Sequence, residues 1–241
     1  MSHTIEIAVQ DVAGARATLE AGAQRVEVCS ALITGGLTPS IGTIEAIVEA
    51  AREADARNFV HVLVRPRPGG FVYDADEIRT QVRDIRAAIM AGANGVVVGA
   101  LSPNGEVDRV ATEQFVAAAQ GLEVTFHRAI DASANPIDEI DTLADLGVTR
   151  ILSSGQAARS RDGIPVLQEM VHRAAGRIQI MAGGGVTVEA IPALFSAGVD
   201  AVHLSARHTV GATDPSGPGG GGVGHDATDA KLVRYAVEAA G

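Results

Sequence analysis

The chain has 241 residues, a formal net charge of −10 at pH 7, 20% charged residues and only 3% aromatic residues. An acidic chain with so few aromatic side chains lacks the basic surface and the stacking platforms of a nucleic-acid-binding protein. No apolar run reaches the length of a membrane span, and a strand pattern that begins at Thr4 leaves no room for a signal peptide. A single cysteine, Cys29, excludes an internal disulfide and a cysteine-rich zinc site. We therefore expect a soluble cytoplasmic protein without a nucleic-acid or membrane partner.

The only lysine is Lys231, near the C-terminus. Pyridoxal phosphate enzymes and Schiff-base aldolases need a lysine amine in the site. This position in the chain is a poor one for such an amine, so we expect neither pyridoxal phosphate nor a Schiff-base lysine.

Strand and helix patterns alternate from the first strand, Thr4–Val9, and the first helical stretch, Ala13–Ala21. Further helical patterns cover 41–54, 75–91 and 137–146, and a third strand covers 58–66. Six times a helix ends, a glycine follows at the left-handed cap position, and a β-branched strand begins within a few residues. These glycines are Gly22, Gly92, Gly121, Gly147, Gly176 and Gly198.

Eight such strand–helix units in this length predict a closed (β/α)8 TIM barrel that forms a single domain over residues 1–241. The alternative is an open doubly wound sheet, which usually carries a glycine-rich phosphate turn after its first strand. The sequence there, "QDVAGA" at 10–15, does not fit that turn. The glycine-rich segment 211–225 precedes a C-terminal helix and is predicted to be a loop, either a flexible connection or a lid.

Strand alternation also predicts which side chains face the barrel interior. Five inward positions carry ionisable groups, whereas barrel interiors are usually filled with Val, Ile and Leu. These positions are Glu6, Glu27, Arg65, His127 and His203. Each could belong to a structural ion pair, such as Glu27 with Arg65. Their convergence favours a polar cavity near the C-terminal ends of the strands.

The loops after strands three, six, seven and eight carry groups suited to a carboxylate or phosphate. Arg65 and Arg67 in "RPRPGG" offer two planar guanidinium groups, and glycine-rich backbone before a helix offers free N–H groups. The candidate anion-binding residues are Arg65, Arg67, Ser154, Gly183, Gly184, Gly185, Ser205 and Arg207. The alternative is that these glycines only allow tight turns.

Two functional hypotheses follow from these residues. The first is an isomerase or lyase acting on a small phosphorylated or carboxylate substrate, in which Glu27 or His127 shifts a proton and Glu6 or Asp131 orients it. The second is copper binding, since a Cys29 thiolate suits Cu(I). Met181 is the one inward thioether we can place, and His203, with His127, could add an imidazole. A lone cysteine can equally be a small buried apolar residue.

Six segments of the sequence resemble the CutC family of copper homeostasis proteins. They are "GAQRVEVCSALITGGLTPSIG", "VLVRPRPGGFVY", "TFHRAID", "ILSSG", "IMAGGGV" and "VHLSAR", within about residues 4–207. The resemblance implies a (β/α)8 barrel, a cytosolic location, assembly into a homo-oligomer and copper as the bound ion. Some family members have a second cysteine where this chain has Ala8, so a site with two thiolates is not available within one chain.

Overall fold

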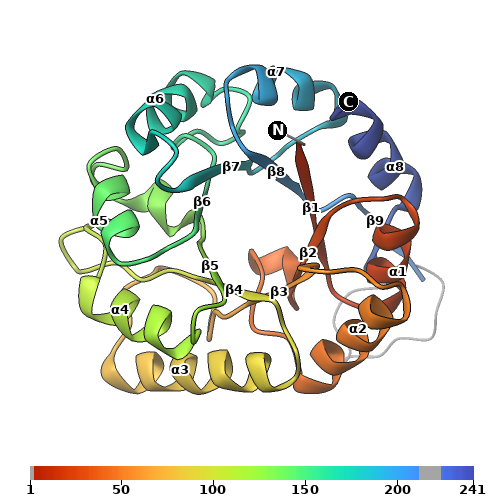
Figure 1. Ribbon diagram of the computed structural model, residues 1–241, viewed down its shortest axis with the longest axis horizontal. Helices are drawn as coiled ribbons and strands as arrows, with labels where there is room; N and C mark the ends of the chain where they lie inside the picture. The colour runs from red at the N-terminus through yellow and green to blue at the C-terminus, as the bar shows by residue number, and fades with distance from the viewer. Residues whose placement is uncertain (1–2, 212–223) are drawn as a thin grey trace.

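The computed structural model describes residues 3–211 and 224–241, and there eight parallel strands close into a barrel (Figure 1). Each strand pairs with the next in the chain, and β1 closes the ring against β8, where Glu6 lies opposite His203. The strands are β1 Thr4–Val9, β2 Arg25–Val28, β3 Val60–Leu63, β4 Gly95–Val98, β5 Glu123–Phe126, β6 Arg150–Ser153, β7 Gln179–Gly183 and β8 Ala201–Leu204. The predicted (β/α)8 barrel is confirmed.

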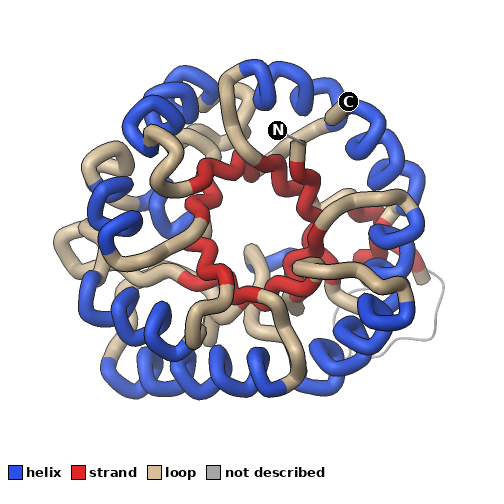
Figure 2. The backbone as a smooth tube through the Cα atoms, viewed as in Figure 1, coloured by secondary structure: helices blue, strands red, loops and turns tan. Residues whose placement is uncertain are grey.

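Helices surround the barrel on the outside (Figure 2). They are α1 Val12–Glu20, α2 Ile41–Glu53, α3 Ala75–Met90, α4 Arg109–Ala118, α5 Glu139–Asp145, α6 Ile164–Ala174, α7 Ile191–Ser196 and α8 Ala230–Ala239, with short 3₁₀ helices η1 Leu32–Thr34, η2 Arg128–Ala132 and η3 Val188–Ala190. The start of α3 is fixed by a capping box, in which Asp74 accepts from the backbone N–H of Glu77 and Glu77 accepts from that of Asp74. Every helix in these ranges is too short or too polar to span a bilayer.

The glycines predicted to end helices adopt the required conformation. All six have positive φ, between 75° and 100°. A residue with a Cβ pays a steric cost in this region, so glycine is favoured where each helix turns into the next strand. The repeated sequence signal therefore marked real helix ends.

The main hydrophobic core lies between the barrel and the helices. Outward-facing strand residues such as Val26, Val62 and Val96 are fully buried there, together with helix residues such as Phe115 and Leu167. Inside the barrel, the apolar residues that the structure describes form two small clusters. One contains Ala8, Cys29, Leu63 and Val97, and the other contains Leu152, Met181 and Ala201. The rest of the interior is left to polar groups.

The chain departs from the predicted pattern after β8. We expected the eighth strand to run through Ser205 to Arg207, but β8 ends at Leu204, because Ala206 takes a left-handed conformation with φ of 37°. Arg207–Val210 instead forms β9, which pairs antiparallel with β10, His225–Thr228. The end of the predicted loop at His225 is therefore strand. Residues 212–223, which carry the rest of that loop and the lid hypothesis, lie outside the described residues.

Candidate functional site

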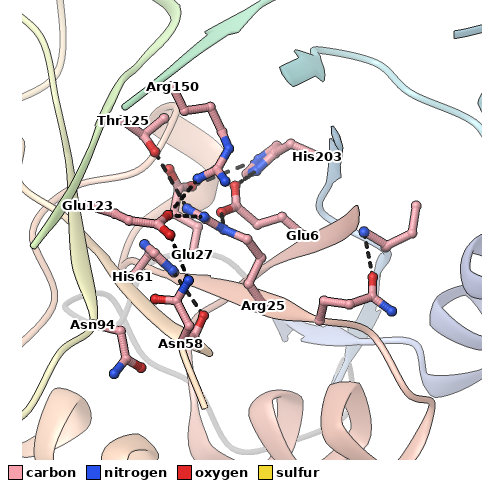
Figure 3. A network of polar contacts seen from close by, with 12 residues as sticks. Glu6, Arg25, Glu27, Asn58, His61, Asn94, Glu123, Thr125, Arg150 and His203 are labelled. Carbon is pink, nitrogen blue, oxygen red and sulfur yellow. Dashed lines mark hydrogen bonds and ion pairs between the residues drawn. The ribbon is translucent and has the colours of Figure 1, made fainter. Parts of the chain in front are cut away.

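A network of buried ion pairs fills the barrel near the N-terminal ends of its strands (Figure 3). The Arg25 guanidinium donates through Nε to Glu6 at 2.5 Å and through Nη1 to Glu123 at 2.9 Å. Arg150 donates to the same Glu123 oxygen at 3.0 Å, and Asn58 donates to the other oxygen at 2.7 Å. Two carboxylates thus neutralise two guanidinium groups.

The pKa values of these groups agree with permanent charges. Burial alone would raise the pKa of Glu6, but the charge of Arg25 and a hydrogen bond from His203 hold it far below its ordinary value. Burial is likewise outweighed at Glu123, where Asn58 and Arg150 lower the pKa to about 2. His61, at the same level, is neutral at pH 7, because burial and the nearby Arg25 charge lower its pKa to about 3. This layer holds charges that do not change near neutral pH.

Above this network, toward the C-terminal ends of the strands, lies a cavity of about 640 Å³. Eight of the fifteen side chains or glycines proposed from the sequence line it. They are Glu27, Arg65, His127, Asp131, Gly184, Gly185, His203 and Ser205. The volume is within the range of small-molecule sites.

Glu27 and His203 form the floor of the cavity. His203 Nδ1 lies 2.7 Å from Glu6 Oε1, and His203 Nε2 lies 3.9 Å from Glu27 Oε2. Burial opposes a charge on His203, but Glu27 and the hydrogen bond to Glu6 outweigh it and raise its pKa. Burial raises the pKa of Glu27 to about 7, with His203 opposing the rise and Glu6 adding to it. The floor therefore has a carboxyl group whose pKa is raised to about 7 and, beside it, an imidazole whose pKa is also raised.

Arg65 and His127 lie on the cavity wall, and both are close to the Phe71 ring. Arg65 is only 7% exposed and donates to the backbone carbonyls of Thr34, Gly36 and Gly69 at 2.9–3.2 Å. It forms no ion pair with any carboxylate of the described residues, so the hypothetical pair with Glu27 is not made, and its Nε has no partner there. Its guanidinium lies 5.3 Å from the Phe71 ring centre.

His127 is a neutral donor. Its Nδ1 accepts from the backbone N–H of Ala129 at 3.1 Å, so the ring proton is on Nε2. Burial and the charge of Arg65 lower its pKa to about 3. The Nε2 atom is buried and has no partner among the described residues. His127 is therefore not a base at neutral pH, and its available group is an N–H.

The Asp131 carboxylate is hydrogen-bonded to the loop after β6. It accepts from the Ser153 hydroxyl at 2.6 Å, from the backbone and hydroxyl of Ser154, and from Arg128 Nε at 2.8 Å. Neither Asp131 nor Glu6 hydrogen-bonds Glu27 or His127, so the pairing we expected between an orienting carboxylate and these groups is absent. Ser154, whose Oγ also lies 2.7 Å from the Ala157 carbonyl oxygen, holds this loop and does not line the cavity.

The glycines after β7 allow side chains to approach the backbone closely. A Cβ at Gly184, where φ is 101°, would lie 2.9 Å from the Arg128 guanidinium carbon. A Cβ at Gly183 would lie 2.5 Å from a Leu152 methyl group. Gly183 itself is not part of the cavity lining, whereas Gly184 and Gly185 are.

Two predicted anion-binding arginines point elsewhere. Arg67 forms an ion pair with Glu77 at the start of α3, donates to the Val72 carbonyl and lies over the Tyr73 ring. Arg207 pairs with Asp226 across the β9–β10 hairpin. Neither side chain lines the cavity, because each is held by a carboxylate of its own loop or hairpin.

The three predicted copper ligands lie in different surroundings. Cys29 is fully buried in its own apolar cluster, and its thiol donates to the Val9 carbonyl at 3.5 Å. Burial, helped by Glu27 and Glu6, raises the pKa of this thiol well above its ordinary value. Met181 is buried in the other apolar cluster, and His203 is bound to Glu6. Within residues 3–211 and 224–241, no three His, Cys, Asp or Glu side chains are grouped so as to hold a metal ion.

Several residues of the cavity were not predicted from the sequence. Arg128, Phe71 and Gln156 line the cavity but were not proposed. Arg128 immediately follows His127 and stands three residues before Asp131, the spacing of a helical ion pair, and this signal could have identified it.

The fold and the site define a (β/α)8-barrel protein with a cavity at the C-terminal mouth of the barrel that both ionisable and apolar side chains line. The model of the CutC family matches residues 3–208. The chain is 43% identical over 204 residues to a CutC family protein of Glaesserella parasuis, covering 84% of this chain and 82% of the relative. A crystal structure from Streptococcus agalactiae, of a protein assigned to copper homeostasis as CutC, is 35% identical and covers 84% of this chain and 98% of its own, with a TM-score of 0.77. This chain belongs to the CutC family.

A more distant structure shows the fold alone. Thiamine phosphate pyrophosphorylase from Pyrococcus furiosus is 13% identical, covers 98% of this chain and 95% of its own, and superposes with a TM-score of 0.62. It supports the barrel architecture and carries no argument about the chemistry.

Proposed function

We propose that this chain serves copper homeostasis in the cytosol. The support is its membership of the CutC family and its 35% identity to the Streptococcus agalactiae protein assigned to that role. The resemblance also implies a homo-oligomer. Light scattering after size-exclusion chromatography tests that assembly, and a mass equal to one chain would contradict it.

For copper binding itself, Cys29 is the only thiol and the best candidate ligand. Cu(I) is bound most tightly by two or more soft donors, and here Met181 and His203 do not join Cys29. The described residues therefore do not fit a tight chelate. We propose weak Cu(I) binding to the Cys29 thiolate, and because the pKa of this thiol is raised, the affinity increases with pH.

A titration of Cu(I) against a competing chelator tests this site. We expect Cys29→Ser to abolish the binding and His208→Gln, a change on the exposed part of β9, to leave it unaltered. A Cu(I) affinity that is the same in Cys29→Ser and in the unmodified chain would remove Cys29 as the copper ligand.

A second candidate function is favoured by one observation, the uncompensated charge of Arg65 on the cavity wall. A buried charge without a counter-ion costs several kcal/mol, and an anionic ligand would supply that counter-ion. We therefore propose that the cavity binds a small carboxylate or phosphate compound. In this second function the chain is an enzyme of the isomerase or lyase type.

Thermal unfolding with phosphate, pyruvate and dihydroxyacetone phosphate tests the anion site. A ligand at 100 times its dissociation constant adds about 3 kcal/mol of stability, which corresponds to roughly 5–11 °C in a chain of this size. We expect Arg65→Lys to reduce the shift and Arg67→Lys, an arginine of the same loop outside the cavity, to preserve it. No shift with any probe, or an equal shift in Arg65→Lys, would contradict the proposal.

A further inference from the structure

Two titratable side chains on the cavity floor, Glu27 and His203, form no ion pair with the arginines of the network. Glu27 comes from β2 and His203 from β8, and both line the cavity. The distance between His203 Nε2 and Glu27 Oε2, 3.9 Å, is too long for a hydrogen bond. Each therefore presents a polar atom to the cavity without using it on the other.

His203 is held in one orientation. Its Nδ1 is bound to Glu6, and Glu6 is fixed in turn by the fully buried contact with Arg25. This arrangement turns Nε2 toward the cavity and favours the protonated ring, since two carboxyl groups outweigh the cost of burial. His203 is thus a preformed donor, and Glu6 is its positioning residue.

Glu27 is free to act on a ligand. Its carboxyl group accepts no hydrogen bond from another residue of the described ranges, although only 7% of its side chain is exposed. A carboxyl group that faces the cavity and has no donor from the described residues is suited to take up and return a proton of a bound ligand. A purely structural role would be served better by an apolar side chain at this position.

We propose that Glu27 and His203 form an acid–base pair that exchanges a proton at carbon in a small anionic oxo compound, with Arg65 holding the anionic group. This proposal rests on the second candidate function above and names its substrate class. The compound carries a carboxylate or phosphate at one end and a carbonyl group next to a C–H bond.

The position of Arg65 fits a compound that has its anionic group at one end and its carbonyl group at the other. Glu27 is level with His61 in the pairing of β2 with β3, and Arg65 follows His61 by four residues. At about 3.3 Å per residue, the Arg65 backbone lies roughly 13 Å further along the barrel. Its guanidinium is tied to the loop carbonyls at the mouth. A ligand anchored at the mouth thus directs its other end to the floor.

The proposed step is balanced without a further reactant. The Glu27 carboxylate takes the proton from carbon, the C–H electron pair forms a carbon–carbon double bond, and the carbonyl π electrons move to oxygen. That oxygen takes the proton of His203 Nε2, which gives an enol, a protonated Glu27 and a neutral His203 still bound to Glu6. Return of the proton from Glu27 to the same carbon, with return of the enol proton to His203 Nε2, reverses the step. Where that carbon carries a hydroxyl group, Glu27 protonates the former carbonyl carbon and the hydroxyl proton passes to the neutral His203, which yields the isomer.

Deuterium exchange tests the proposal. Pyruvate and dihydroxyacetone phosphate are incubated with the full chain in D₂O, and the loss of their C–H signals is followed by proton NMR. We expect the chain to accelerate exchange for a probe that it binds. Glu27→Gln, an isosteric change, should slow exchange by about 100-fold or more and keep the thermal shift with the same probe. Glu53→Gln, on the outside of the barrel, is the matched control and should change neither.

The outcomes separate this proposal from the one it rests on. If no probe binds, the anion site itself fails, and the acid–base pair fails with it. If a probe binds through Arg65 but no exchange occurs, the anion site stands and the acid–base pair is refuted. Exchange that survives Glu27→Gln also refutes the pair. Loss of exchange in His203→Gln with retained binding supports the role of Nε2.

Discussion

Replacing Glu6 by glutamine tests how the charged interior of the barrel is stabilised. Glu6 is fully buried and accepts two charge-assisted hydrogen bonds, from Arg25 at 2.5 Å and from His203 at 2.7 Å. Glutamine has nearly the same shape, so packing is preserved, but it lacks the negative charge and replaces one of the two accepting oxygens by an NH2 group. Arg25 would keep Glu123 as its remaining carboxylate partner.

The expected loss of stability is large. Removing one partner of a buried ion pair costs about 3–5 kcal/mol, because the other charge stays buried without compensation. For a chain of this length, 1 kcal/mol corresponds to roughly 2–4 °C. Glu6→Gln should therefore lower the melting temperature by about 6–20 °C. The matched change is Glu53→Gln, which breaks the Arg16–Glu53 pair where both side chains are about half exposed. Such surface pairs contribute about 0–1 kcal/mol.

Denaturant unfolding of the unmodified chain and the two variants at pH 7 measures the loss of unfolding free energy in each variant. The two variants differ in burial and not in the chemical change, so the difference between them isolates the buried environment. If Glu6→Gln costs no more than Glu53→Gln, the network is not a stabilising unit, and our account of the interior is wrong.

Three further predictions concern single residues. Gly36→Ala should destabilise the chain by about 1–3 kcal/mol, because φ at Gly36 is 86° and the new Cβ would lie 2.7 Å from a Leu63 methyl group. Denaturant unfolding measures this loss, and an unchanged midpoint contradicts it. The Cys29 thiol should react with a disulfide reagent at pH 8 far more slowly in the native chain than in the unfolded one, since it is buried and its pKa is raised; equal rates would refute this. Glu27→Gln should become progressively more stable relative to the unmodified chain as the pH rises from about 4.5 through 7. The folded state holds a proton on Glu27 that the unfolded state has released, so native stability falls with pH there; a difference that does not vary with pH would contradict the raised pKa of Glu27.

Local patterns were sufficient to predict the barrel. Six helix ends were marked by glycines whose positive φ the structure confirms, and strand alternation placed Glu6, Glu27 and His203 inside. The β9–β10 hairpin was missed, because it depends on the left-handed conformation of Ala206, and alanine carries no signal for that conformation.

The partners of the interior side chains could not be predicted. Alternation along a strand gives the face of a residue but not the neighbour that it meets across a closed barrel. An ion pair of Glu27 with Arg65 was one alternative, yet Glu27 lies beside His203, because β1 closes the ring against β8 and brings Glu6 level with His203. Arg67 looked equivalent to Arg65 in sequence, and only the position of Glu77 on α3 shows that it is held outside.

The distribution of charge separates the two proposed functions in space. Below the cavity, Glu6 and Glu123 balance Arg25 and Arg150, so the network contributes little net field. In the cavity, the charge of Arg65 is not balanced by a carboxylate of the described residues. An anion bound there is attracted, and negative charge that develops on its oxo group is stabilised. Cys29 does not line this cavity and lies in an apolar cluster. Copper binding and anion binding are thus independent properties, and Cys29→Ser and Arg65→Lys should each abolish or weaken one without affecting the other.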